Sequence, residues 1–171
     1  WGADELADIA PPLTWVVEGL VPEKSQLIVA GSPKTSKKSW LCAVLADCVA
    51  SGKPFMGFPT VRRPVVYLAL EGSKDYMGRR WKAIGRGGAR SEVTPLTEGS
   101  LITRFGIAGY ERTLDALRTT EVLVVADPLV RVLAHKGLNE NDSAEVAGLL
   151  YEHEELINMG PGATLIWVHH F

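Results

Sequence analysis

The sequence predicts an α/β fold, a mostly parallel β-sheet flanked by helices, and three observations support this prediction. Short, nearly continuous runs of Val, Ile and Leu suit strands that are buried on both faces, as in a parallel sheet. Stretches with apolar residues at helical spacing separate these runs, and this alternation is typical of βαβ units. The chain has 171 residues, 46% of them hydrophobic, which suits one domain with its own core.

Five apolar runs are the candidate strands, and the third in chain order is the weakest of them. They are residues 26–30 (QLIVA), 64–70 (PVVYLAL), 101–105 (LITRF), 121–126 (EVLVVA) and 163–168 (ATLIWV). Four stretches between or after them have helical patterns: residues 38–51, 73–85, 110–119 and 142–159. Gly52 and Gly160 follow two of these stretches, and glycine is a natural residue at the end of a helix. The pattern therefore predicts one domain over residues 1–171.

Composition restricts the class of protein. The net charge of −2 does not indicate nucleic-acid binding, because proteins dedicated to binding nucleic acids carry an excess of basic residues. Cys42 and Cys48 lie six residues apart in a predicted helix and match neither a metal-ligand pair nor a disulfide framework. We expect reduced thiols in a cytoplasmic protein, without a membrane span. Because the chain begins at Trp1 and stops at Phe171 directly after an apolar run, we also expect a longer protein, truncated here at both ends.

Residues 30–40, AGSPKTSKKSW, lie between the first predicted strand and the first predicted helix and resemble a phosphate-binding loop. In the usual pattern, G-x-x-x-x-G-K-[ST], backbone N–H groups surround the phosphates, Lys reaches the outer phosphates and a hydroxyl reaches Mg²⁺. No register satisfies all four fixed positions. The candidate nucleotide-binding residues of the loop are Gly31, Ser32, Pro33, Lys34, Thr35, Ser36, Lys37, Lys38 and Ser39.

Three registers of this loop remain open. With Gly31 first, Ser36 replaces the second glycine and Lys37 is the phosphate lysine. With Ser32 first, Lys38 and the following Ser39 take the Lys and Ser places, and we prefer this register because a helix N-terminus favours phosphate. A loop one residue longer than usual also fits, at about 1–2 kcal/mol for each non-glycine residue forced to positive φ. The alternative is that this stretch binds no ligand and is only a basic turn before the helix.

Polar groups follow three further predicted strands: Glu71, Asp127, and the pair His169 and His170. Ligands bind at the carboxyl ends of parallel strands, so we expect these groups to meet the loop in one site. Asp127 suits a Mg²⁺ water, although an Asp-Pro turn explains it as well. Glu71 could activate an attacking water. It could instead be an acidic residue that stabilises the N-terminus of the following helix.

The two histidines are adjacent on a strand and therefore point to opposite faces. We expect one of them to face the site, where an imidazole could donate to a γ-phosphate and report its loss, and the other to pack. Two interpretations are open for Trp40, stacking on the nucleotide base or packing in the core.

The motifs, in this order, resemble those of the RecA-like P-loop ATPases, close to the RepA-like hexameric replicative helicases. The resemblance rests on residues 15–59, VVYLALEGS with two following arginines, VLVVADPL with NEND, and LIWVHH. It implies an AAA-type Mg²⁺-dependent ATPase that assembles head to tail in a ring, possesses helicase activity on single-stranded DNA, and serves replication of a plasmid, phage or mobile element. The missing second glycine departs from the family pattern.

The resemblance also assigns roles to residues. It implies Lys38 as phosphate lysine, Ser39 as Mg²⁺ ligand, Glu71 as catalytic carboxylate, Asp127 as Walker B acid, and His170, with His169 as second choice, as γ-phosphate sensor. Arg79 and Arg80 resemble arginines that approach the nucleotide, although a solvated helix face explains them equally well. Residues 131–142 correspond to a DNA-facing loop. A different function, in place of an ATP-driven motor, is also open: a regulatory or assembly module that binds nucleotide with little hydrolysis.

Overall fold

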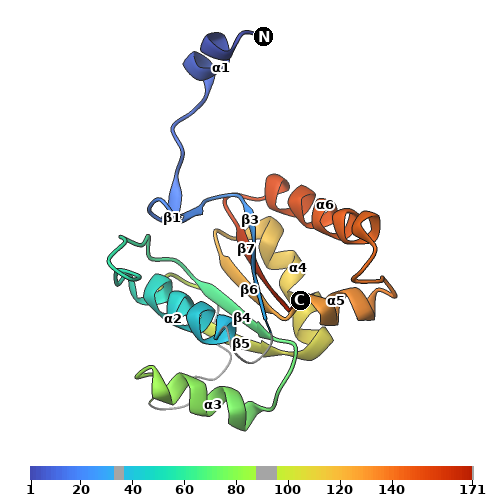
Figure 1. Cartoon of the computed structure of the whole chain (residues 1–171). Helices are drawn as coiled ribbons and strands as arrows, with labels where there is room; N and C mark the ends of the chain where they lie inside the picture. The colour runs from blue at the N-terminus through green and yellow to red at the C-terminus, as the bar shows by residue number, and fades with distance from the viewer. Residues whose placement is uncertain (33–36, 88–95, 171) are drawn as a thin grey trace.

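The computed structural model describes residues 1–32, 37–87 and 96–170. Its main sheet has five parallel strands in the order β3-β7-β6-β4-β5 (Figure 1). The strands are β3 (Gln26–Gly31), β4 (Val65–Ala69), β5 (Leu101–Phe105), β6 (Leu123–Asp127) and β7 (Thr164–His170). All five predicted strands are present, and the predicted α/β class with a mostly parallel, RecA-like sheet is confirmed. The weakest candidate is the edge strand β5, whose residues are all only half-buried.

Helices cover both faces of this sheet. They are α2 (Lys38–Ser51) and α3 (Lys74–Ala83) on one face, and α4 (Gly106–Thr119), α5 (Leu129–His135) and α6 (Ser143–Met159) on the other (Figure 1). Each face has its own apolar core, and the strand residues alternate between the two cores. The four predicted helices are present, but α4 begins four residues before the predicted start at Tyr110.

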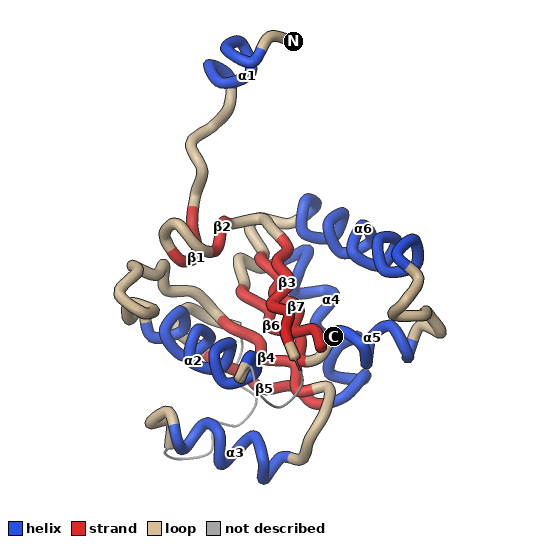
Figure 2. Tube along the Cα trace, viewed as in Figure 1, coloured by secondary structure: helices blue, strands red, loops and turns tan. Residues whose placement is uncertain are grey.

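Four elements were not expected from the sequence. Helix α1 (Ala3–Ile9) has no buried residue and stands away from the sheet at the end of an extended segment (Figure 1). Strands β1 (Trp15–Val17) and β2 (Val21–Pro22) form a small antiparallel hairpin at the amino end of β3 (Figure 2). Helix α5 occupies the first part of the stretch 131–142, which the sequence analysis treated as a loop, because its apolar residues pack under the sheet.

Strand alternation decides which side chains face α2 and α3. On β4, Tyr67 belongs to the core on this face, whereas its neighbours Val66 and Leu68 belong to the other core. On β7 the core on the α2 side contains Val168, so the next residue of the same parity, His170, points to this face as well. The α2 side of the sheet is therefore the side on which the predicted site residues gather.

Helix α2 contains both cysteines. Cys42 is buried and Cys48 is half-buried, and both are free thiols. Burial, followed by the nearby charge of Asp127, raises the pKa of the Cys42 thiol to about 12, so this thiol stays protonated and acts as a small apolar side chain. Within the described residues, no helix combines the length and apolar character needed to cross a membrane.

A buried histidine on α6 makes the fold sensitive to acid. The Nε2 atom of His153 lies 2.9 Å from the hydroxyl of Tyr110, and its Nδ1 atom lies 2.7 Å from the carbonyl oxygen of Leu149. The ring also packs edge-on against Trp167, with the centroids 5.0 Å apart. A neutral ring satisfies both contacts when Nδ1 donates to the carbonyl and Nε2 accepts from the phenol. Burial lowers the pKa of His153 below its ordinary value of 6.5.

The free energy of unfolding is expected to fall as the pH drops below about 6.5. Because the unfolded chain binds this proton more tightly than the native chain, protonation favours unfolding, and the loss continues down to the lowered native pKa. Urea unfolding at pH 7.5 and pH 5.5 measures the effect. The variant His153→Gln should be less stable at pH 7.5 but should depend less on pH across this interval. An equal pH dependence of wild type and variant would contradict the assignment.

Candidate functional site

Two adjoining clefts of about 410 and 150 Å³ lie at the carboxyl end of the sheet, on the side of α2 and α3. Residues from five different elements and from the turn after β4 line the larger cleft, among them Ser39, Glu71, Arg80, Asp127 and His170. Lys37, Lys38, Ser39 and Trp40 line the smaller one, together with three residues shared with the larger. The structure thus places side chains from the ends of β4, β6 and β7 beside the start of α2, as the parallel-sheet argument expects.

Helix α2 begins at Lys38, directly after the loop. Lys37 precedes it in the left-handed conformation, with φ of 54°, which is the kind of strain that a loop without its second glycine requires. Its side chain is exposed, whereas Lys38 is only 5% exposed and donates from Nζ to the carbonyl oxygens of Gly31 and Ser32. Lys38 therefore reaches back to the exit of β3. The loop residues Pro33, Lys34, Thr35 and Ser36 lie outside the described residues.

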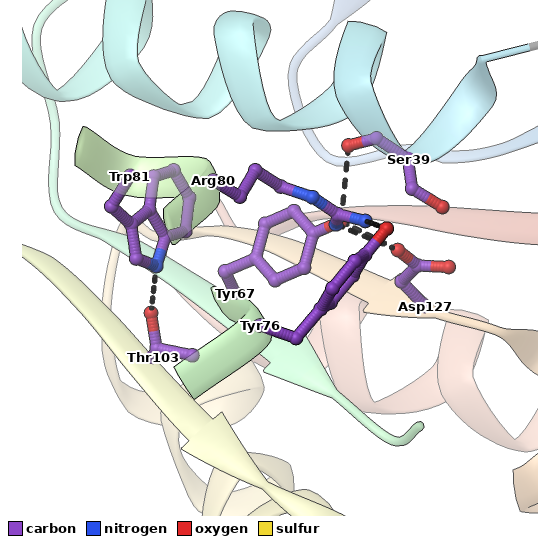
Figure 3. A network of polar contacts seen from close by, with 7 residues as sticks. All are labelled: Ser39, Tyr67, Tyr76, Arg80, Trp81, Thr103 and Asp127. Carbon is purple, nitrogen blue, oxygen red and sulfur yellow. Dashed lines mark hydrogen bonds and ion pairs between the residues drawn. The ribbon is translucent and has the colours of Figure 1, made fainter. Parts of the chain in front are cut away.

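Asp127 lies at the base of the cleft and is 9% exposed. Its Oδ2 atom accepts a hydrogen bond from the hydroxyl of Tyr67 at 2.6 Å and lies 3.5 Å from Nη1 of Arg80 (Figure 3). Burial, and then the charge of Asp127, raise the pKa of Tyr67, so the phenol keeps its proton and remains a donor. Tyr67 is a site residue that the sequence analysis missed.

Arg80 connects several aromatic side chains at the wall of both clefts. Its guanidinium donates to the hydroxyls of Tyr67 and Tyr76, at 3.0 and 3.1 Å. The same group lies 5.0 Å from the ring centroid of Tyr76 and 5.8 Å from that of Trp40, within the range of cation–π attraction. Arg80 is 5% exposed whereas Arg79 is exposed, so the solvated-face interpretation is wrong for Arg80 and fits Arg79.

Trp40 is exposed and lines the smaller cleft. The expectation that it packs in the core is therefore wrong, because it belongs to neither apolar cluster. The physical reason is its place on the outer face of α2, where Leu41 and Val44 are exposed as well. An exposed indole beside the loop keeps the stacking interpretation open.

Glu71 lies at the rim of the larger cleft and forms an ion pair with Arg131 on α5, with 2.8 Å between Oε1 and Nε. Both side chains are about half exposed, so the pair contributes little to stability. Arg131 is helical, and Lys136 forms an ion pair with Glu152 on α6. The stretch 131–142 is thus not one DNA-facing loop, since its first part packs as α5 and both of its basic side chains have acidic partners.

The two terminal histidines of β7 are separated by strand alternation. His170 lines both clefts and pairs in register with Gly31 at the start of the loop. His169 lines neither of them and points to the opposite face. The Nδ1 atoms of both rings are buried without a hydrogen-bond partner in the described part of the chain. For His170 this leaves a polar atom in need of a partner at the wall of the clefts.

The donor set fits a Mg²⁺ ion that arrives with a triphosphate. Ser39 and Asp127 offer a hydroxyl and a carboxylate to the same cleft, and oxygen atoms are the ligands that Mg²⁺ prefers. Across the described residues, no group of three or more His, Cys, Asp or Glu side chains could hold a metal. Mg²⁺ characteristically takes one or two protein ligands plus water and phosphate oxygens, so this small set suits it.

Comparisons with known proteins found a matching family and similar solved structures. A family model described as an AAA domain matches residues 1–171. A solved structure of a prototypical ATPase from the type III secretion system of pathogenic bacteria aligns with a TM-score of 0.45 and 14% identity. That alignment covers 99% of this chain and 53% of the other, so the chain spans about half the length of that protein. No curated protein sequence matches this chain.

Proposed function

The chain belongs to the AAA domain family along its whole length, and from this premise we propose that it binds and hydrolyses ATP with Mg²⁺ in the cleft at the carboxyl end of the sheet. One observation supports the proposal most directly. The start of α2, Asp127, Glu71 and His170 reach one cleft from four parts of the chain. This set contains a helix N-terminus for phosphate, an acid and a hydroxyl for Mg²⁺, and a second acid for water.

Each residue has a separate role in this proposal. Lys38 binds the outer phosphates, and Ser39 and Asp127 hold Mg²⁺, which neutralises phosphate charge as it develops. Glu71 orients the attacking water and takes its proton. The imidazole of His170, whose Nδ1 atom has no hydrogen-bond partner among the described residues, supplies a hydrogen bond to the γ-phosphate and registers its loss.

We further propose that this ATPase is the motor domain of a RepA-like hexameric ring helicase that acts on single-stranded DNA. The order of the sequence motifs supports this, since the Walker A-like loop, Glu71, the Walker B acid Asp127 and the terminal histidines follow one another as in that family. Replication of a plasmid, phage or mobile element is the corresponding process.

A nucleotide-binding regulatory or assembly module with little hydrolysis is the second candidate. Two observations favour it. Lys37 takes a left-handed conformation in place of a glycine, and Glu71 is paired with Arg131 instead of being available to a water.

ATP hydrolysis by the full-length protein, with and without single-stranded DNA, separates the two candidates. For the motor we expect Mg²⁺-dependent turnover that single-stranded DNA stimulates and blunt double-stranded DNA does not. The matched control is Asp127→Asn, which should lose turnover under both conditions. Tight ATP binding with no turnover, unchanged by DNA, would instead favour the module, and no ATP binding at all would exclude both.

A further inference from the structure

Tyr67 lies at the centre of the polar network beneath the cleft, although the sequence motif that contains it suggested no role for it. Its side chain is wholly buried and faces α2 and α3. Its hydroxyl contacts three groups on three other elements: Asp127 on β6, Arg80 on α3 and the backbone carbonyl of Ser39 on α2 (Figure 3). A single atom thus touches the helix that follows the loop, the acid and the buried arginine.

The hydrogen-bond geometry assigns the direction of these contacts. A phenol has one proton to donate and two lone pairs. Arg80 can only donate, so Tyr67 accepts from it at 3.0 Å. The phenolic proton goes to Asp127 at 2.6 Å and not to the Ser39 carbonyl at 3.3 Å, because a charged acceptor makes the shorter and stronger bond. Oδ2 of Asp127 is therefore held, while Oδ1 has no donor within the described residues.

The ring that presents this hydroxyl packs against α3, which is itself bonded to β5. It packs edge-on against Trp81 of α3, with the centroids 5.3 Å apart and the planes at 90°. The indole Nε1 of Trp81 in turn donates to Oγ1 of Thr103 on β5 at 2.8 Å. Since the ring cannot turn without displacing this packing, the hydroxyl oxygen is kept within hydrogen-bond distance of Asp127.

On the basis of the proposed function, we propose that Tyr67 is a positioning residue that orients the Asp127 carboxylate for Mg²⁺. The Tyr67 hydroxyl donates to Oδ2 of Asp127. The Oδ1 atom of Asp127 is then available to the cation or to a water molecule that the cation binds. The hydroxyl also takes up one donor of Arg80, whose positive charge otherwise competes for the same carboxylate. Removing the hydroxyl loosens the carboxylate and lets Arg80, whose Nη1 atom already lies 3.5 Å from Oδ2, approach it more closely, and both effects weaken cation binding.

The test is Tyr67→Phe, measured by electron paramagnetic resonance of Mn²⁺ with a non-hydrolysable ATP analogue in the full chain. We expect the Mn²⁺ affinity of the complex to fall about tenfold, while the affinity for the metal-free analogue stays unchanged. The matched control is Tyr110→Phe, which removes a buried phenol hydroxyl on the other face of the sheet, where it contacts His153. This control should lower the thermal midpoint and leave Mn²⁺ affinity unchanged.

The outcomes distinguish this proposal from the proposed function. Wild-type Mn²⁺ affinity in Tyr67→Phe, or an equal loss in both variants, overturns the positioning role and leaves ATP binding intact. A wild type that takes up neither the analogue nor Mn²⁺ overturns the proposed function and this role with it. If Tyr67→Phe does not fold, Trp81→Phe replaces it, since losing the bond to Thr103 frees the ring and should also lower Mn²⁺ affinity.

Discussion

Replacing Lys38 with alanine is expected to lower the affinity for ATP about a hundredfold and so to abolish binding under ordinary assay conditions. Lys38 is buried at the entry of α2, with its Nζ atom on the carbonyl oxygens of Gly31 and Ser32. When phosphate is present, this ammonium group has an anionic acceptor nearby, and a hydrogen bond to a charged group contributes about 1.5–3 kcal/mol. Isothermal titration calorimetry with Mg²⁺ and a non-hydrolysable analogue measures the change.

Lys37→Ala is the matched control, because it removes the same charge one residue earlier from an exposed side chain. Lys37 directly precedes α2 and Lys38 is its first residue. Loss of either positive charge therefore changes the electrostatic potential in the clefts by a similar amount. Affinity close to that of the wild type is expected for this variant. The reverse result, a damaging Lys37→Ala and a silent Lys38→Ala, would falsify the register in which Lys38 and Ser39 take the Lys and Ser places.

Replacing Glu71 with glutamine is expected to lower the rate of ATP turnover by about two to four orders of magnitude, the contribution of a positioned general base. Glutamine keeps the size of the side chain and its hydrogen bonding but cannot accept the proton of the attacking water. ATP affinity should stay near that of the wild type, because Glu71 lies at the rim of the cleft. Single-turnover kinetics with radiolabelled ATP, together with the calorimetric affinity, separate the two effects.

The ion pair between Glu71 and Arg131 provides a second comparison. Arg131→Gln releases the carboxylate without removing it, so turnover should be retained if Glu71 is the base. Glu111→Gln is the control, since Glu111 is another exposed acid with a basic neighbour, His135, at 3.5 Å. A Glu71→Gln variant that hydrolyses ATP at the wild-type rate would assign the base to another group.

The sequence predicts the fold well because its signals are local. Strands buried on both faces need continuous apolar runs, and these appear in β4 and β6 as five successive buried residues each. The place of Asp127 and His170 at strand ends follows from the same runs, since parallel strands finish at one edge. Helix α5 was missed because all but its first two residues lie in the stretch 131–142, which was assigned to a loop by resemblance alone.

Tyr67 shows why the polar network could not be predicted in the same way. Its partner Asp127 is 60 residues away in the chain, and the two meet only because β4 pairs with β6. In the sequence, Tyr67 is one more apolar residue in a buried strand. The ion pair of Glu71 with Arg131 likewise depends on where α5 packs, and the burial of Arg80 depends on α3 lying close to the start of α2.

The sequence by itself determined the α/β class, the strands, the main helices and the polar residues at the strand ends, because periodicity and chain order are properties of short segments. The tertiary structure alone decided which histidine faces the clefts, that Arg80 is buried beside Asp127 while Trp40 is exposed, and that Tyr67 joins them. These outcomes depend on strand order and helix packing, which bring distant residues within a hydrogen bond of each other and which no local pattern specifies.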